Sequence, residues 1–208
     1  RDNARRAVHH AARSIPIPEG VFDRVHMDLL QLEPSYHDPP LNYVLLIVDA
    51  FTKYPVAYAL PNKEALTVAR HFWLAICTFG TPKVLITDNG AEFVNDLLES
   101  LTALHGIDQR LITPYRPQAN GQVERYNGVL LSALRKLTGD APENWPEWLD
   151  FALLAVRTAT SSVTGFSPFE LMFGREFHPL ADYSIFDWGV LTGPEAEVDT
   201  VATLIERR

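Results

Sequence analysis

The chain has 208 residues, of which 47% are hydrophobic and 21% charged, and this apolar content is enough for one sizeable core. No stretch approaches the roughly 18 uncharged apolar residues needed to cross a membrane, and the arginine-rich start has no apolar segment typical of a signal peptide. The single cysteine, Cys77, excludes an internal disulfide and indicates a reducing compartment. Because it lies in the apolar run HFWLAICTFG, we expect a buried and inert thiol.

The first half of the chain predicts three strands joined by short loops. Residues 25–32 alternate between apolar residues and a polar or functional side, and residues 43–51 form a continuous apolar run typical of a central strand. Residues 54–61 follow after only two residues, as in a hairpin. These strands predict an antiparallel meander.

The hydrophobic period then changes to that of helices. We expect a helix at 64–80 with its core stripe at Leu66, Ala69, Phe72, Trp73, Ile76 and Phe79. The elements expected after it are a strand at 83–88, a helix at 92–106, a strand at 107–113, a Pro- and Gly-rich loop, and helices at 123–137, 145–160 and 167–174.

The predicted fold class is therefore α/β, a mixed five-stranded sheet with three antiparallel strands, then parallel strands, flanked by helices. Right-handed crossovers can place the fourth strand beside the first, which would bring Asp28 and Asp88 side by side.

The formal net charge of −8 is unevenly distributed. Residues 137–208 contain 4 Lys/Arg and 12 Asp/Glu and account for all of it, whereas residues 1–136 hold 14 of each sign. Residues 110–136 have five basic residues against a single acid, Glu124. Nucleic acid could dock on this basic segment, because phosphate contacts depend on the local field. A solvated helix face would explain the segment equally well.

Three acidic residues lie in or next to apolar segments, where a buried core usually has no carboxylates. Asp28 lies in the middle of the first strand, Asp88 ends the fourth strand, and Glu124 stands near the start of the third long helix. A lone buried carboxylate is costly unless it is paired or bound to a metal, and a divalent cation relieves the repulsion between neighbouring carboxylates. The three acids are therefore candidate metal ligands.

Each acid also has a structural explanation. Asp28 could be a surface acid on an alternating strand, residues 88–90 read Asp-Asn-Gly and form a good turn sequence, and Glu124 could favour the helix dipole. Two further acids compete as ligands. These are Asp49, in the apolar second strand, and Glu92, which we expect to cap the following helix.

Together these segments resemble the integrase core of retroviruses and of gypsy-type LTR retrotransposons. HMDLL around Asp28, TDNGAEF around Asp88 and NGQVER around Glu124, with 35 residues between the last two acids, are similar to the family's Asp, Asp-35-Glu pattern. IVDAFTKYPVAYAL resembles the family's second and third strands, and AVRTATSSVTGFSPFELMFGRE the segment after the core. The likeness covers about residues 15–180.

The resemblance implies an RNase H-like fold and an integrase that uses two Mg²⁺ or Mn²⁺ ions. Asp28 would bridge both ions, with Asp88 and Glu124 each holding one. Such an enzyme processes the 3′ ends of the element's DNA and joins them to target DNA, with water and a DNA 3′-hydroxyl as successive nucleophiles. Carboxylates suit this chemistry because hard divalent cations prefer oxygen ligands.

The resemblance also assigns DNA contacts or loop positioning to polar residues in and before the third long helix. The alternative is that these residues are simply solvated. They are Tyr115, Gln118, Asn120 and Asn127. Arg125 is a further candidate DNA contact, as a phosphate partner by its charge, and a surface charge is the alternative. Family members often have Lys or Arg at the position of Gly128, so the contact expected there is missing.

For the domain organisation we expect a basic N-terminal arm at 1–14, the integrase core at 15–180 and an acidic tail at 181–208. The expected partners are DNA and further copies of the chain, with no membrane. The expected location is the nucleus, or a virus-like particle or the cytoplasm of a host cell, without secretion. The alternative function is a domesticated or truncated integrase core that binds nucleic acid or protein without full activity.

Overall fold

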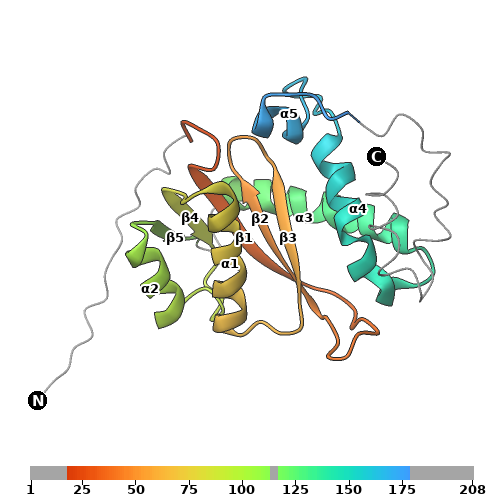
Figure 1. The fold of residues 1–208 in the computed structure, drawn as a ribbon, viewed down its shortest axis with the longest axis horizontal. Helices are drawn as coiled ribbons and strands as arrows, with labels where there is room; N and C mark the ends of the chain where they lie inside the picture. The colour runs from red at the N-terminus through yellow and green to blue at the C-terminus, as the bar shows by residue number, and fades with distance from the viewer. Residues whose placement is uncertain (1–17, 113–116, 179–208) are drawn as a thin grey trace, which may run out of the picture. The chain divides into compact units, whose positions relative to one another are not determined.

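The computed structural model describes residues 18–112 and 117–178, and in the second range it describes side chains from Tyr126 onward (Figure 1). The chain divides into two units, Arg1–Arg175 and Glu176–Arg208, and the fold presented here lies in the first. The described part contains no helix that is both long and apolar enough to span a membrane. Both ends of the chain fall outside the described residues, so the expected boundaries of the arm and the tail stay predictions.

A mixed five-stranded sheet forms the centre of the fold. The pairings are antiparallel between β1 and β2 and between β2 and β3, and parallel between β1 and β4 and between β4 and β5. The predicted meander and the predicted place of the fourth strand beside the first are both confirmed. The strands, in the sheet order β3-β2-β1-β4-β5, are β1 (Arg24–Gln31), β2 (Tyr43–Asp49), β3 (Pro55–Leu60), β4 (Val84–Thr87) and β5 (Asp108–Leu111).

Helices cover both faces of the sheet. In Figure 1, α1 and α2 lie in front of the sheet and α3 crosses behind it. α3 packs on β1 and β2, α4 packs on β3 and α3, and α5 packs on α4. The helices are α1 (Ala65–Phe79), α2 (Asp96–Leu104), α3 (Pro117–Thr138), α4 (Trp145–Thr158) and α5 (Pro168–Phe173), with a short 3-10 helix, η1 (Pro142–Asn144), before α4.

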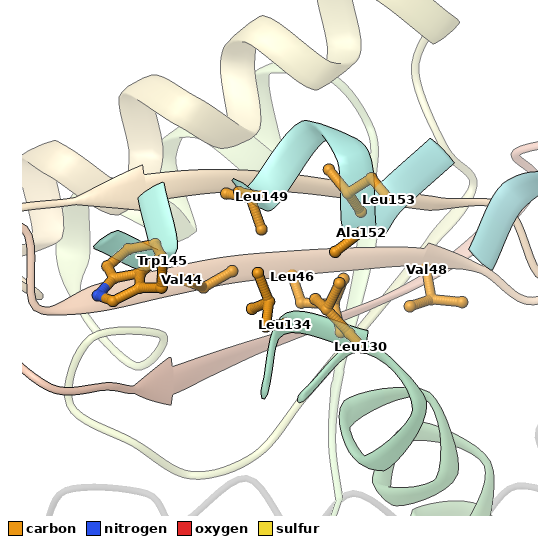
Figure 2. Packing of buried hydrophobic residues seen from close by; sticks show 9 residues of the cluster. All are labelled: Val44, Leu46, Val48, Leu130, Leu134, Trp145, Leu149, Ala152 and Leu153. Carbon is orange, nitrogen blue, oxygen red and sulfur yellow. The ribbon is translucent and has the colours of Figure 1, made fainter. Parts of the chain in front are cut away.

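The core between α3, α4 and the sheet begins on β2. Val44, Leu46 and Val48 occupy alternate positions of this strand, so their side chains point to one face. Full burial of a large apolar side chain contributes roughly 1.5–3 kcal/mol, so this cluster fixes α3 firmly against the strands. Figure 2 shows the partners that meet them, which are Leu130 and Leu134 of α3 and Trp145, Leu149, Ala152 and Leu153 of α4.

α3 begins earlier than the sequence predicted. The helix starts at Pro117, whereas the Pro- and Gly-rich segment before Val123 was expected to be a loop. Proline is well tolerated in the first turn of a helix, because its missing N–H has no intrahelical partner there. The early start means that Glu124 lies two turns inside α3 and not at its beginning.

The expectation that Glu92 caps the next helix is wrong. α2 begins at Asp96, and its N-cap is Asn95, whose side-chain oxygen accepts a hydrogen bond from the backbone N–H of Leu98 at 2.9 Å. Asparagine is among the preferred N-cap residues, because its short side chain reaches the free N–H groups of the first turn. Glu92 therefore lies in the turn before the helix.

The buried face of α1 differs from the predicted stripe. Val68 and Ala75 are fully buried, whereas Leu66 is 68% and Trp73 41% exposed. Cys77 is also exposed, which contradicts the buried thiol expected from its apolar neighbours. Apolar residues occupy most positions of this helix and extend beyond its buried face, with Thr67, Arg70, His71 and Thr78 the exceptions.

Candidate metal centre

Asp28 lies in β1, on the face of the sheet that α3 covers. It is half-buried, and its Oδ1 accepts the backbone N–H of Leu29 at 2.8 Å. Across the ladder it pairs with Leu46, a member of the core beneath α3 and α4. The structure thus places an acid at the margin of an apolar core, where a carboxylate is retained only if other groups satisfy it.

Asp88 follows directly after β4 and is exposed. Its Oδ1 accepts the backbone N–H of Gly90 at 2.8 Å, which closes a turn of the kind that aspartate favours. Gly90 lies next to the carboxylates of both Asp88 and Glu92. A Cβ at this glycine would lie 2.8 Å from Cδ of Glu92 and 3.0 Å from Oδ1 of Asp88, so both acids crowd the same small space. Sequence reasoning missed that Asp88 and Glu92 both lie against Gly90, although their four-residue spacing across a glycine turn was visible.

The register of the sheet brings Asp28 and Asp88 to the same level. The parallel ladder of β1 and β4 joins His26 to Ile86, and each acid lies two residues further along its own segment. Side chains two residues apart in a strand point to the same face of the sheet, and adjacent strands lie about 4.8 Å apart. The two carboxylates therefore belong to neighbouring positions at one end of the ladder.

Asn127 ties α3 to this position. Its Nδ2 donates a hydrogen bond to Oδ2 of Asp28 at 2.5 Å, across 99 residues of sequence. Glu124 precedes Asn127 by three residues in the same helix, and residues at this spacing are neighbours on a helix surface. The structure describes the backbone of Glu124 in α3 and does not describe its side chain.

His26 is a member of the site that sequence reasoning missed. It precedes Asp28 by two residues on β1, so it shares the same face of the sheet, and it is only 6% exposed. Burial, helped by the positive charges of Arg24 and Lys53, lowers the pKa of His26 to about 4. The imidazole is therefore neutral at neutral pH and does not neutralise Asp28.

Asp49, the competing acid of β2, serves a structural purpose. It is 1% exposed, and its Oδ2 accepts the N–H and the hydroxyl of Thr52 at 2.9 and 2.6 Å. Its Oδ1 accepts the N–H groups of Phe22 and Phe51. These bonds hold the turn between β2 and β3.

The donor set fits a hard divalent cation. Asp28 and Asp88 offer carboxylate oxygens from neighbouring strands, and Mg²⁺ and Mn²⁺ prefer oxygen ligands. Within the residues that the structure describes, no group of three or more His, Cys, Asp or Glu side chains is close enough to hold a metal ion. A third carboxylate would have to come from the undescribed side chains, of which Glu124 belongs to the helix that contacts Asp28.

The predicted DNA-binding residues are mostly outside this description. Tyr115 lies in an undescribed segment, and the side chains of Gln118, Asn120 and Arg125 are not described. Asn127 is described, and its amide nitrogen already donates a hydrogen bond to Asp28. Its Oδ1 is buried without a hydrogen-bond partner among the described residues, and an oxygen acceptor cannot bind a phosphate.

Comparison with known proteins gives three kinds of match. Residues 18–117 match the family described as Integrase core domain. A Pol polyprotein of Feline endogenous virus ECE1 is 35% identical over 76% of the chain, and a retrovirus-related Pol polyprotein from transposon 412 of Drosophila melanogaster is 34% identical over 76%. The chain spans only 16% and 13% of these two polyproteins.

Solved structures show the same fold. The catalytic core domain of BIV integrase aligns with a TM-score of 0.62 and 25% identity, over 74% of this chain and 95% of that one. The HTLV-2 integrase catalytic core domain in complex with magnesium aligns with a TM-score of 0.62 and 18% identity, over 74% of this chain and 98% of that one. The predicted RNase H-like architecture is thereby confirmed.

Proposed function

Since this chain belongs to the integrase core domain family, which its residues 18–117 match, we propose that it is a metal-dependent polynucleotidyl transferase. Its reactions are the processing of retroelement DNA 3′ ends and the joining of these ends to target DNA. The observation that supports this most strongly is the juxtaposition of Asp28 and Asp88 at one end of the β1–β4 ladder, with α3 bonded to Asp28 through Asn127.

Asp28, Asp88 and Glu124 are the proposed ligands of two Mg²⁺ or Mn²⁺ ions. The sequence resemblance assigns Asp28 to both ions and Asp88 and Glu124 to one ion each. When bound, the ions lower the pKa of water and stabilise the charge that develops on the attacking and leaving oxygens. A solved relative supports the choice of metal, since the HTLV-2 core was determined in complex with magnesium.

The chain's own residues hold the site in shape. The Leu29 N–H and the Asn127 amide each bond one oxygen of Asp28, so this carboxylate cannot rotate freely. The Gly90 N–H does the same for Asp88. Pre-organised carboxylates reduce the entropy lost when ions and substrate are positioned, and positioning is the main task in phosphoryl transfer.

Asn127 is proposed to act first as a positioning residue and only second as a DNA contact. One N–H of its amide is directed to Asp28, and the other remains a donor for a phosphate oxygen. Tyr115, Gln118 and Asn120 stay proposed DNA contacts because of the sequence resemblance, and Arg125 because of its charge. DNA and further copies of the chain are the proposed partners, and solved relatives occur as dimeric and trimeric integrase cores and in an intasome.

The test uses a branched DNA-end substrate with Asp28→Asn and Glu124→Gln variants. Both should lose Mg²⁺-dependent cleavage and joining while keeping the circular dichroism spectrum of the wild type. Asp96→Asn and Glu99→Gln are matched controls, because both acids are exposed in the first turn of α2, and they should retain activity. Full activity of both site variants would refute the assignment. A wild-type chain that binds DNA but no Mg²⁺ in calorimetry would favour a binding module without catalysis.

A further inference from the structure

Two arginines and a neutral histidine lie on the same face of the sheet as Asp28. Arg24 and His26 precede Asp28 at alternate positions of β1, so all three side chains leave the strand in one direction. His26 pairs with Ile86 of β4, and Ile86 pairs with Arg110 of β5. Paired residues share a face, so Arg110 lies on this side too, two strands from His26.

The cations at and near this face repel one another. Burial and then repulsion from Arg110 lower the pKa of Arg24, and burial and then repulsion from Arg24 lower the pKa of Lys53, in the turn after β2. The charge of Asp49 opposes the lowering of both pKa values, and its oxygens accept hydrogen bonds from Phe22, Phe51 and Thr52. A further anion here would relieve repulsion among the cations.

Two polar side chains on this face also have unused nitrogen atoms. The Nε and Nη2 atoms of Arg110 both donate to a single oxygen of Asp108, at 2.9 and 2.6 Å. Its Nη1 atom is buried without a partner among the described residues, and so is Nδ1 of the 94% buried His26. A guanidinium can only donate, and a buried donor without an acceptor destabilises the fold. The group missing at Arg110 is therefore an acceptor, whereas the neutral imidazole of His26 can meet either kind of partner.

We propose that this face, formed by Arg24, His26 and Arg110, binds the phosphate backbone of the DNA a few nucleotides away from the phosphodiester that reacts at Asp28. The inference rests on the proposed function. Arg24 precedes Asp28 by four residues, about 13 Å along a strand. One strand of duplex DNA advances by about 3.4 Å per phosphate along its axis, so this distance corresponds to about four nucleotides. Arginine suits phosphate because its planar fork donates two parallel hydrogen bonds.

The salt dependence of DNA binding tests this inference separately from catalysis. A fluorescently labelled duplex is titrated by anisotropy in EDTA at several salt concentrations, with the wild type and with Arg24→Gln and Arg110→Gln. Each lost phosphate contact should reduce the slope of log K against log salt by about 0.9. Arg70→Gln is the matched control, because it removes the same charge from an exposed position of α1 on the opposite face, and its slope should equal that of the wild type.

The outcomes separate the two proposals. An unchanged slope in both Arg24→Gln and Arg110→Gln, with wild-type DNA binding intact, would overturn the phosphate site and leave the proposed function standing. An equal decrease in Arg70→Gln would also overturn it, since the effect would then reflect net charge alone. A wild-type chain that does not bind the duplex would contradict both proposals. If Arg110→Gln fails to fold, Arg110→Lys replaces it, because lysine keeps the charge but lacks the planar guanidinium. A weaker affinity of Arg110→Lys for the duplex would then support the site, and an unchanged affinity would refute it.

Discussion

The hydrogen bond between Asn127 and Asp28 should couple the stability of α3 to the candidate metal centre. The change to make is a double-mutant cycle of Asp28→Ala, Asn127→Ala and the double variant. A hydrogen bond to a charged group is worth about 1.5–3 kcal/mol when buried, and the half-buried position of Asp28 reduces this because solvent screens the charge. We therefore expect a coupling free energy of about 1–2 kcal/mol.

The cycle removes the effects that do not depend on the bond. Alanine has a higher helix propensity than asparagine, by about 0.5–0.7 kcal/mol, and this gain occurs in both variants that change residue 127, so it cancels from the coupling. Urea unfolding followed by circular dichroism in EDTA gives the four free energies of unfolding without interference from metal binding. Additivity of the two single changes to within about 0.3 kcal/mol would refute the coupling.

Three further predictions concern the surroundings of the site. Asp49→Ala should destabilise the protein by about 3 kcal/mol, because it leaves the buried donors of Thr52 and its neighbours unsatisfied, and thermal unfolding that matches the wild type would contradict this. Leu130→Ala should lower the free energy of unfolding in urea by about 2–5 kcal/mol. Val129→Ala, at a 45% exposed position, should change it by less than about 0.5 kcal/mol. Equal effects of the two changes would argue against a core that contains Leu130 and excludes Val129. Gly90→Ala should weaken Mg²⁺ binding several-fold in calorimetry, because the new Cβ would displace the carboxylates of Asp88 and Glu92. Gly128→Ala is the control and should bind Mg²⁺ normally, since a Cβ at Gly128 meets open space. Wild-type affinity in Gly90→Ala would show that the space around Gly90 is unimportant for metal binding.

The sheet could be predicted from the sequence because its strands differ in pattern. The continuous apolar run of β2 indicates burial on both faces, and all of its residues from Val44 to Asp49 are buried. Right-handed crossovers then allowed a position for β4 beside β1, and the structure has it there. Asp28 and Asp88 became neighbours through that rule and not through any local feature of the two segments.

Helix boundaries and faces were harder to predict, for physical reasons. Gly121 and Pro117 are ordinary signals of a loop, yet a proline in the first turn costs a helix little, and α3 begins there. In α1, apolar residues extend beyond the buried face, so the exposed Trp73 and Cys77 could not be distinguished from the buried stripe. The burial of both residues was wrongly expected.

Contacts between distant segments could not be derived from spacing at all. The bond from Asn127 to Asp28 joins residues 99 apart, and the approach of Arg110 to Arg24 depends on the register of three strands. His26 could have been identified earlier, because strand alternation places it beside Asp28. It was instead grouped with the polar side of the strand, whereas the structure buries it.

The most direct test of the metal centre is anomalous diffraction from crystals soaked in Mn²⁺. We predict manganese peaks between Asp28 and Asp88, with carboxylate oxygens of these residues and of Glu124 at about 2.0–2.2 Å. The Asp28→Asn variant should lose the peak that both aspartates share. A well-ordered site without manganese at saturating concentration, or peaks confined to acids elsewhere, would contradict the assignment of Asp28, Asp88 and Glu124 as metal ligands.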